Sequence, residues 1–270
     1  MHLEVAGKTD VGMKRDHNED NFMLLPEENV FCVADGMGGH SSGEVASQIA
    51  VTEIAEFFKM TSADDEVTWP FKMDKARSYD ENRISVAIKL ANRRIFETSQ
   101  RNSKQRGMGT TVVAVYCKDR EAFVAHVGDS RVYRYIAAER RLVQLTEDHS
   151  LLNDYIRAKK LTAEEIKNFP HKNVIVRALG MKDNVAVDVS RIAPSENDTF
   201  LLCSDGLSGM IKDAQMQEIL RTETDLARAT EKMIAGANAA GGVDNVTCVL
   251  VRWHEGGPTA VPPPLPTAQA

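Results

Sequence analysis

The fold is decided at Phe31-Cys32-Val33-Ala34-Asp35-Gly36-Met37-Gly38-Gly39-His40, a short apolar run followed by one carboxylate and a glycine-rich turn. An apolar run this short predicts a buried strand, and the residues from Ser41 to Met60 carry a helical pattern. A desolvated carboxylate is costly unless it is paired or bound to a metal. Asp35, at the predicted end of the strand, is therefore a candidate functional residue.

The residues around this stretch predict further strands and helices by their apolar periods. Apolar residues that alternate with polar ones favour a strand, and apolar residues three and four apart favour a helix. Ser41 and Glu44 have the spacing of a capping box, which starts a helix there. The predicted elements up to residue 100 are a strand around Leu3 and Val5, a hairpin of Glu19–Leu25 and Asn29–Ala34, and helices over Ser41–Met60 and Tyr79–Gln100, with a loop over Thr61–Lys75.

The second half of the chain opens with four strands that are separated by short polar turns. Short turns indicate antiparallel pairing, because parallel strands need long crossovers. A polar segment over Ser150–Asn168 follows, and its place between strands predicts a mobile flap. The predicted elements are strands over Thr110–Cys117, Glu121–Val127, Ser130–Ile136 and Arg141–Leu145, helices over Ser150–Lys160 and Thr162–Asn168, strands over Val185–Ile192 and Thr199–Cys203, helices over Asp213–Arg221 and Asp225–Ala240, and a strand over Asn245–Trp253.

This order of elements predicts an α+β fold. Strands in meanders with helices grouped in pairs are typical of a layered sandwich. The chain has 270 residues, of which 43% are apolar, and one large core accounts for that length without a second domain. We expect a domain over residues 1–254 and a disordered, proline-rich tail over residues 255–270.

Composition and charge exclude several classes of protein. The formal net charge of −6 leaves no basic surface for nucleic acid or for an anionic membrane. No run approaches the roughly 18 apolar residues of a membrane span, and residues 1–10 lack a signal-peptide pattern. The four cysteines lie singly in apolar runs, as buried free thiols do in a reducing compartment. We therefore predict a cytoplasmic protein that binds neither nucleic acid nor membrane.

Acidic residues recur at the predicted ends of strands, far apart in the sequence. Asp-Gly is a common turn pair, so a plain turn explains any one of these positions taken alone. If the strand ends meet at one edge of a sandwich, however, the carboxylates form a cluster that cannot stay ionised without cations. The acids in question are Glu19, Asp20, Asp35, Asp129, Asp205 and Asp244.

Such a cluster would bind hard divalent metal ions. All-oxygen sites select Mg²⁺ or Mn²⁺ over zinc and copper, and the backbone carbonyl of Gly36 can add one oxygen. Two ions about 4 Å apart can activate a water and screen an anionic substrate, as phosphate ester hydrolysis requires. Arg15, four residues before Glu19, has the planar fork that suits phosphate oxygens. A surface arginine in a loop would look the same in the sequence.

Two other patterns are weighed against this site. Gly36-Met37-Gly38, between a strand and a helix, superficially matches a dinucleotide-binding loop, but the third glycine position holds Ser41 and no βαβ unit follows. His126 lies within a predicted strand, where a histidine is more often a core residue than a metal ligand. His149 lies where a helix is predicted to start.

A set of motifs spread along the chain now gives a resemblance. The chain resembles the metal-dependent protein serine/threonine phosphatases of type 2C, in the form common in bacteria. The motifs run in family order from about residue 3 to residue 252 and are specific as a set. They are Arg15-Asp16-His17-Asn18-Glu19-Asp20, Val33-Ala34-Asp35-Gly36-Met37-Gly38-Gly39-His40, Gly109-Thr110-Thr111, Val127-Gly128-Asp129-Ser130-Arg131, Leu145-Thr146-Glu147-Asp148-His149-Ser150, Arg177-Ala178-Leu179-Gly180, Leu202-Cys203-Ser204-Asp205-Gly206 and Asp244-Asn245-Val246-Thr247.

The resemblance implies a fold and a metal site. The family fold is a four-layer αββα sandwich of two antiparallel sheets with helix pairs outside, and the segment at about 148–176 matches the family's flap. Two catalytic Mn²⁺ or Mg²⁺ ions are implied, with a third, weaker ion at Asp129. The implied ligands of the two ions are Asp35, the carbonyl of Gly36, Asp205 and Asp244, with Glu19 or Asp20 ligating a metal or holding its water.

The implied catalytic groups include one departure from the family pattern. Arg15 would hold the phosphate. Eukaryotic relatives place a histidine directly after the Asp-Gly pair as a proton donor to the leaving group, whereas this chain has Met37 there. His40 is the nearest imidazole and is a possible general acid, with a water molecule at the metal centre as the alternative.

The activity implied is removal of phosphate from phosphoserine and phosphothreonine in proteins, by a water that a binuclear centre activates. The partners would be phosphoproteins made by a bacterial serine/threonine kinase, and the enzyme would be a monomer that takes part in signal transduction. Two alternatives stay open. One is a phospho-binding regulatory domain on the same scaffold, against which the complete set of acids argues. The other is a hydrolase of small phosphoesters, which the same metal site would support.

Overall fold

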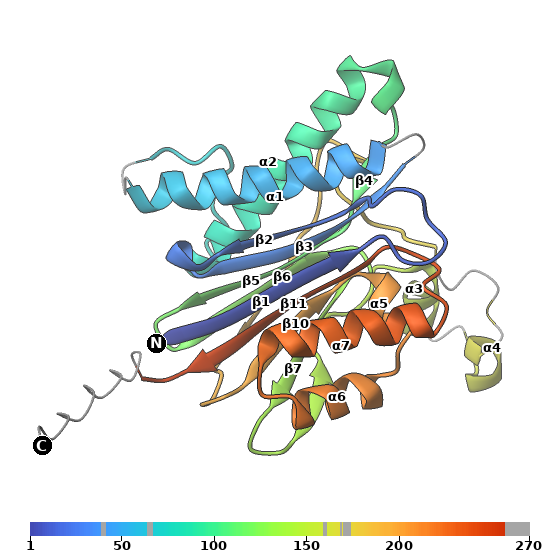
Figure 1. The fold of residues 1–270 in the computed structure, drawn as a ribbon. Helices are drawn as coiled ribbons and strands as arrows, with labels where there is room; N and C mark the ends of the chain where they lie inside the picture. The colour runs from blue at the N-terminus through green and yellow to red at the C-terminus, as the bar shows by residue number, and fades with distance from the viewer. Residues whose placement is uncertain (39–41, 64–66, 159–160, 168, 170–173, 257–270) are drawn as a thin grey trace, which may run out of the picture.

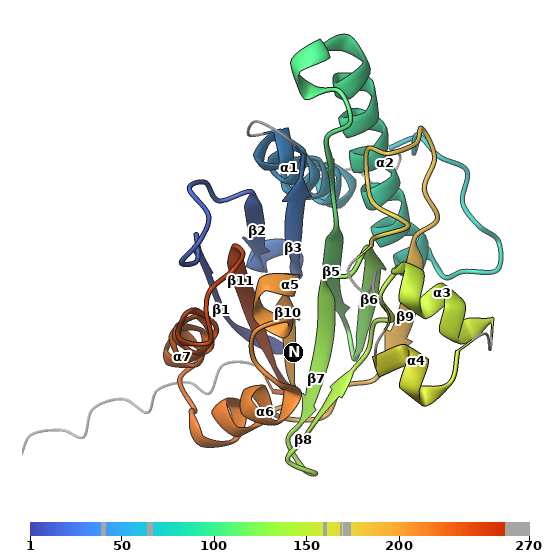
Figure 2. The same ribbon diagram turned by 90° about the vertical axis from the view of Figure 1, so that its right-hand side faces the viewer.

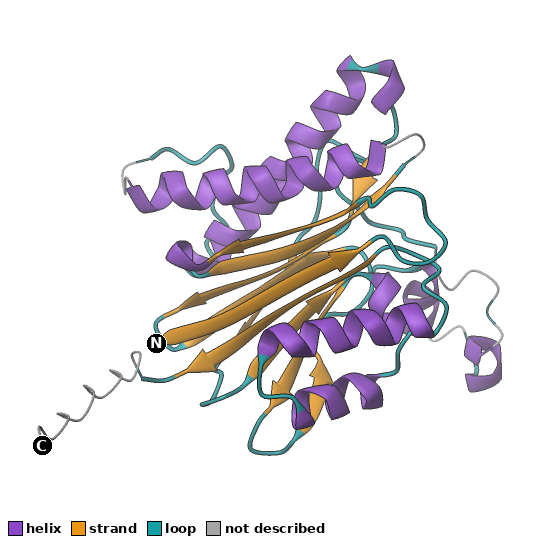
Figure 3. Cartoon of the chain, in the orientation of Figure 1, coloured by secondary structure: helices purple, strands orange, loops and turns teal. Residues whose placement is uncertain are grey.

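Two antiparallel sheets lie face to face at the centre of the molecule, with helices on both outer faces (Figure 1). The computed structural model describes residues 1–38, 42–63, 67–158, 161–167, 169 and 174–256. Strands and helices separate into layers, as Figure 3 shows by colour. The predicted α+β sandwich of four layers, helix, sheet, sheet and helix, is therefore confirmed.

The first sheet, sheet B, contains the stretch from Phe31 to Asp35, which lies within strand β3. Its strand order is β2-β3-β5-β6-β9, and the short β4 pairs with β3 beyond β5. All of its pairs are antiparallel. The strands are β2 (Asp20–Leu25), β3 (Val30–Met37), β4 (Gly109–Thr110), β5 (Val112–Lys118), β6 (Glu121–Val127) and β9 (Asp188–Ile192).

The second sheet, sheet A, joins the two ends of the described chain. Its strand order is β1-β11-β10-β7-β8, again with antiparallel pairs. The strands are β1 (His2–Asp10), β7 (Arg131–Ile136), β8 (Arg141–Gln144), β10 (Thr199–Cys203) and β11 (Val246–His254). β1 pairs with β11 from His2 opposite His254 to Asp10 opposite Val246.

Strand β3 is apolar along its length because it is buried on both faces. Phe31 and Val33 point into the core between the two sheets. Val30, Cys32 and Ala34 point the other way, into the core beneath the helices. Side chains alternate across a strand, so a strand covered on both sides needs apolar residues at every position.

The helices complete the outer layers in pairs. α1 (Ser42–Ala63) and α2 (Tyr79–Arg101) cover sheet B, and α6 (Asp213–Thr222) and α7 (Leu226–Ala239) cover sheet A, where α5 (Asp205–Ser208) also packs (Figure 2). The Ser78 hydroxyl and the Glu81 side chain form the capping box that starts α2. Short helices lie at η1 (Pro26–Glu28), η2 (Ser103–Gln105), α3 (Leu151–Arg157) and α4 (Ala163–Lys167).

The structure differs from the sequence predictions at several boundaries. β3 was predicted to end at Ala34, but it continues through Asp35 to Met37, because Gly36 and Met37 pair with β4. The predicted strand over Thr110–Cys117 is divided at Thr111, whose backbone N–H donates to the Asp35 carbonyl at 2.8 Å. α1 extends to Ala63, into the predicted loop, and the four-residue α5 was not predicted.

Several predictions fall wholly or partly outside the described residues. These are the helix start at Ser41, parts of the flap at 159–160, 168 and 170–173, and the tail from residue 257. The described parts of the flap contain α3 and α4, where two short helices were predicted. Within the described ranges, none of the helices combines the length and the apolar character that a bilayer crossing requires.

Candidate metal centre

The strand pairing brings the acidic residues to one edge of the sandwich. In sheet B, Asp20 at the start of β2 lies opposite Asp35 near the end of β3. In sheet A, Ser204 alone separates Asp205 from the end of β10, and Asp244 comes just before β11. Because β10 and β11 are antiparallel neighbours, the end of one lies beside the start of the other. Asp129 lies in the turn from β6 to β7, at the same edge.

Asp35 lies at the centre of this cluster. Burial, followed by the charges of Asp20, Asp205, Asp129 and Asp244, raises the pKa of Asp35 well above the ordinary value for an aspartate. Like charges that share one site disfavour ionisation, and nearby cations restore it. The centre of the cluster therefore needs positive charge if its carboxylates are to be ionised at neutral pH.

Asp20 is the most enclosed acid of the cluster, with 5% of the residue exposed. Its Oδ2 accepts hydrogen bonds from the Thr247 hydroxyl at 2.7 Å and from the Ser204 hydroxyl at 2.8 Å. Burial raises the pKa of Asp20 to about 7 against these two hydrogen bonds, and Asp205 and Asp244 add to the rise. Neither hydroxyl was predicted from the sequence, although each lies in a motif beside a predicted ligand.

Asp129 has a buried oxygen that lacks a hydrogen-bond partner among the described residues. That oxygen is Oδ1, and the residue is 8% exposed. Burial, followed by the charge of Asp205, raises the pKa of Asp129 to about 7. The pKa of Asp205 is itself raised, by burial and then by Asp244, against a hydrogen bond with Asp35. An unpaired buried carboxylate oxygen is costly, and a cation would relieve that cost.

Arg15 is one basic residue beside these acids; another, Arg131, acts on the pKa of Asp129 and Asp205. Its Nη2 donates to Asp244 Oδ2 at 2.7 Å, and 53% of its side chain is exposed. Asp244, followed by Glu19 and Asp35, raises the pKa of Arg15 above its ordinary value. Burial raises the pKa of Glu19, against a hydrogen bond from the Gly43 backbone and the charge of Arg15. Arg15 thus contacts the acid cluster while it keeps an exposed face for an anion.

The loop that carries Arg15 is held by Asn245, which the sequence analysis also missed. The Asn245 Nδ2 donates to the carbonyls of Val11 at 2.9 Å and His17 at 2.8 Å. Its Oδ1 accepts from the Glu19 backbone N–H at 2.9 Å. One side chain therefore fixes three points of the loop. Its place directly after Asp244 in a quoted motif was the available signal.

Glycine is required after Asp35 because two backbones pass each other there. A Cβ on Gly36 would lie 2.2 Å from the carbonyl oxygen of Gly43, and a Cβ on Gly43 would lie 2.7 Å from Glu19 Oε2. The Gly36 N–H also donates to the Glu19 carbonyl at 3.2 Å. The start of α1, the end of β3 and the Glu19 loop can meet at the site only without these side chains.

A second cluster of possible ligands, His126, His149 and Asp188, lies near the flap. In the described part of the chain, these three are the one group of histidines and acids whose ligand atoms all lie within 4.8 Å of one another. The Arg177 guanidinium lies 2.9 Å from His149 Nε2 and 2.8 Å from Asp188 Oδ1, so a cation already occupies the position. His149 Nδ1 accepts from the Gly128 N–H at 3.0 Å. We therefore assign this cluster a structural role, in fixing the turn from β6 to β7.

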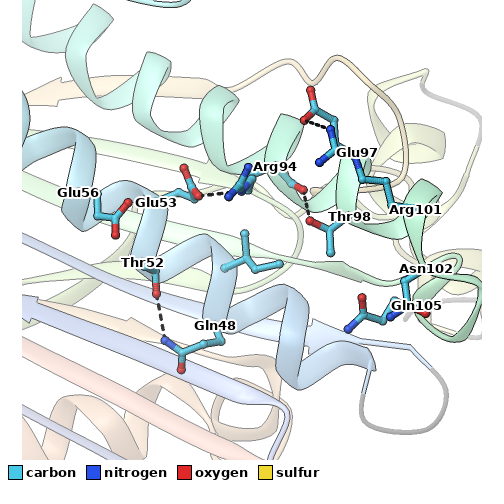
Figure 4. A pocket seen from close by; sticks show the side chains of 11 residues that line it. Gln48, Thr52, Glu53, Glu56, Arg94, Glu97, Thr98, Arg101, Asn102 and Gln105 are labelled. Carbon is cyan, nitrogen blue, oxygen red and sulfur yellow. Dashed lines mark hydrogen bonds and ion pairs between the residues drawn. The ribbon is translucent and has the colours of Figure 1, made fainter.

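Two hollows in the surface differ in their relation to the acids. The hollow of about 600 Å³ lies between α1 and α2 and contains Glu53, Arg94 and Glu97 (Figure 4). Arg94 is paired there with Glu53 at 3.3 Å, and none of the predicted ligands lines it. The other hollow, of about 470 Å³, is lined by residues 14–17, Glu19, Gly38 and Asn245. This second cleft adjoins the acid cluster at Glu19 and carries both basic and acidic side chains.

The residues of the cluster fit hard divalent cations. Every donor is an oxygen, which suits Mg²⁺ or Mn²⁺, and the raised pKa values and the unpaired Asp129 oxygen show where positive charge is lacking. Met37 follows the Asp-Gly pair and offers no proton. The suggested role of His40 lies outside the described residues.

The sequence matches one family along most of its length. A family model described as protein phosphatase 2C matches residues 13–253. A serine/threonine phosphatase, stp, from Listeria monocytogenes is 38% identical over 258 residues, which cover 93% of this chain and 95% of that protein. The protein phosphatase PhpP from Streptococcus pneumoniae is 35% identical over 256 residues, covering 94% of this chain and 98% of that protein.

Solved structures agree with the sequence matches. The serine/threonine phosphatase PstP/Ppp of Mycobacterium tuberculosis superposes with a TM-score of 0.81 at 29% identity, over 94% of this chain and all of that chain (100%). A structure of the catalytic domain of the phosphatase PstP in complex with two manganese ions superposes with a TM-score of 0.75 at 30% identity, over 93% of this chain and 97% of that chain.

Proposed function

The chain belongs to the protein phosphatase 2C family and is a metal-dependent protein serine/threonine phosphatase; from this premise we propose which of its residues perform the reaction. The carboxylates of Asp35, Asp205 and Asp244 and the carbonyl of Gly36 would hold two ions, and Glu19 or Asp20 would ligate a metal or hold its water. When bound, the ions supply positive charge to the phosphate and activate water for attack on phosphorus.

One observation carries this proposal. Burial and the charges of four neighbouring carboxylates, those of Asp20, Asp205, Asp129 and Asp244, raise the pKa of Asp35. A protein keeps so many acids together at a cost in stability, and binding of divalent ions offsets that cost. The hydroxyls of Ser204 and Thr247 hold Asp20 in one orientation, as a preorganised ligand requires.

Arg15 binds the phosphate of the substrate in this proposal. Its guanidinium is exposed in the cleft, next to Lys14 and His17. The two parallel donors of an arginine match two phosphate oxygens. Asn245 keeps the loop in place, so that Arg15 reaches the phosphate from the side of Asp244.

Several finer features belong to the same proposal. The physiological ion is Mn²⁺ or Mg²⁺; the relative of known structure was solved with two manganese ions. Asp129, with its unpaired oxygen, is the ligand of a third, weaker ion. The enzyme acts as a cytoplasmic monomer in signalling, on phosphoproteins that a serine/threonine kinase has modified. Its domain spans residues 1–254, with a flap at about 148–176.

The test is release of phosphate from synthetic peptides in the presence of Mn²⁺. We expect turnover of phosphothreonine and phosphoserine peptides that a chelator abolishes and added Mn²⁺ restores. Phosphotyrosine peptides and p-nitrophenyl phosphate serve as comparisons. Equal or better turnover of the small ester would favour a small-phosphoester hydrolase, and metal-dependent binding of the peptide without release would favour a regulatory domain.

A further inference from the structure

Three apolar side chains are exposed beside the cleft that leads to the acid cluster. Val11 is 36% exposed, Met13 64% and Val243 51%. They lie on two loops, one before Arg15 and one before Asp244. Single exposed apolar residues are common, but several together beside a binding cleft are a mark of an interaction surface. We call these three residues the Met13 patch.

The two loops are fixed to each other, so this exposure is a property of a fixed backbone. The Met13 N–H donates to the Gly242 carbonyl at 2.7 Å, and the Gly12 N–H donates to Asp10 Oδ1 at 2.9 Å. A Cβ on Gly12 would lie 2.2 Å from the Asp244 carbonyl oxygen, and a Cβ on Gly242 would lie 2.7 Å from Met13 Cγ. The loops therefore touch along their backbones and hold the patch ready for a partner.

The distance from the patch to the phosphate site is limited by the chain itself. Met13 is two residues from Arg15, and two residues of chain span at most about 7 Å. Val243 is bonded directly to Asp244, whose Oδ2 lies 2.7 Å from Arg15 Nη2. A peptide that places its phosphate at Arg15 therefore has the patch within reach of the two or three residues that flank the modified side chain.

We propose that the Met13 patch binds an apolar side chain of the phosphoprotein substrate, next to the phosphorylated residue, and so determines sequence preference. The inference rests on the proposed function, because it takes its register from a phosphate at Arg15. Met13 directly precedes Lys14, which lines the cleft together with Arg15, Asp16, His17 and Glu19. Apolar selection beside a charged pocket separates a protein substrate from a small phosphoester, which has no flanking residues.

A second copy of the chain fits the patch less well than a substrate side chain. A stable protein interface buries at least about 1,000 Å² in total, and three side chains offer only part of that. One leucine or phenylalanine side chain is matched in size to two or three apolar neighbours. Partial burial of such a side chain changes the specificity constant by about tenfold.

The experiment uses the full chain with Mn²⁺ and pairs of phosphothreonine peptides that differ in a single flanking residue, leucine or serine. We expect one or more positions within about three residues of the phosphothreonine at which the leucine peptide has about tenfold higher kcat/KM, through a lower KM. We expect this preference to fall in the Met13→Ser variant. In the double variant, Met13→Ser with Val243→Ser, it should fall to about twofold or less. Turnover of p-nitrophenyl phosphate stays at the wild-type level.

Met73→Ser is the matched control, since Met73 is 48% exposed in the loop between α1 and α2; it should keep the full preference. Equal turnover of leucine and serine peptides by the wild type overturns the inference and leaves the proposed function intact. A parallel fall in p-nitrophenyl phosphate turnover in the Met13 variants also overturns it, because the patch would then support the metal site. So does a wild-type dimer that Met13→Ser dissociates. Absence of phosphate release from every substrate contradicts the proposed function itself.

Discussion

An aspartate lies beside each end of strand β10, Asp198 fully buried and Asp205 partly buried, and the surroundings of the two differ. Asp198, before the strand, is completely buried (0% exposed). It is paired with the Arg134 guanidinium and accepts backbone N–H bonds from Ser195 at 2.9 Å and Ala137 at 3.0 Å. Asp205, after the strand, has Asp244 beside it, and its pKa is raised by burial and by that charge.

The difference between them separates structure from function. A buried carboxylate with a cation and several donors is a satisfied part of the core. A buried carboxylate among other carboxylates is satisfied only by something that binds from outside. The same criterion separates His149 and Asp188, which are paired with Arg177, from Asp129, whose Oδ1 has no hydrogen-bond partner among the described residues.

The largest effect that this contrast predicts is on activity at the Asp205 end. Asp205→Asn removes a proposed metal ligand, so turnover of a phosphothreonine peptide should fall by about a thousandfold or more. Thermal stability without metal should stay equal or rise, because one repelling charge is gone. Steady-state kinetics with Mn²⁺ and a melting curve of the metal-free protein measure the two effects. Turnover within tenfold of the wild type would remove Asp205 from the site.

At the other end of the strand, substitution of Asp198 should change the stability of the fold and leave the catalytic rate unchanged. Asp198→Asn leaves the buried Arg134 guanidinium without its counter-ion, which should lower the free energy of unfolding by about 3 kcal/mol. The kcat of the folded enzyme should remain near the wild-type value. Urea denaturation followed by kinetics on the folded fraction tests both expectations. If Asp198→Asn lost activity as Asp205→Asn does, without loss of stability, the contrast would be wrong.

The unpaired Asp129 should make stability depend on pH in the metal-free protein. The pKa of Asp129 is about 7 in the folded state, against 3.8 for an ordinary aspartate. Between these values the folded state holds a proton that the unfolded state releases, so the free energy of unfolding decreases as pH rises from about 4 to about 7.

Asp129→Asn lacks this proton, and its stability relative to the wild type should therefore rise over the same pH range. The expected gain is on the order of 1–3 kcal/mol. Asp20 and His149 titrate in both proteins. In the variant the pKa of Asp35 is raised less, because the Asp129 charge is gone, so the difference between the two proteins measures Asp129 together with its effect on Asp35. Urea denaturation at about pH 5 and about pH 7.5 with a chelator provides the measurement. A constant difference would contradict the raised pKa.

The smallest of the predicted effects concerns Arg15, the cation that touches the acid cluster. Arg15→Ala should raise KM for a phosphothreonine peptide by about tenfold and change kcat much less, as loss of binding to the phosphate does. Arg15→Lys keeps the charge without the two-pronged donor, so its KM should lie between those of the wild type and Arg15→Ala. A collapse of kcat at unchanged KM would show that Arg15 acts on the transition state alone.

Much of the fold could be predicted because apolar periods are local. The strands and long helices of both halves follow from such periods, and β3 reads as a continuous apolar run because it is covered on both faces. The extension of β3 to Met37 could not be predicted, since its partner β4 lies some 70 residues away in the chain. The four-residue α5 is too short to show a helical period.

The candidate site was predicted as a set of acids but without their supports. Strand ends with carboxylates gave Asp20, Asp35, Asp129, Asp205 and Asp244 from residue type alone. The supporting residues Ser204, Asn245 and Thr247 were not predicted, because a hydroxyl or an amide in a motif does not show which acid or backbone group it will contact. Distances across the two sheets decide that.

The pairing of β1 with β11 has a consequence for the order in which the enzyme matures. Every strand of sheet B lies between residues 20 and 192, so that sheet can form before synthesis of the chain is complete. β1, made first, waits for β11, which is made last among the strands. Asp244 arrives with β11. A nascent chain thus carries Arg15 early but lacks the carboxylate that Arg15 contacts until synthesis has passed strand β11, so the proposed metal site is completed late in synthesis.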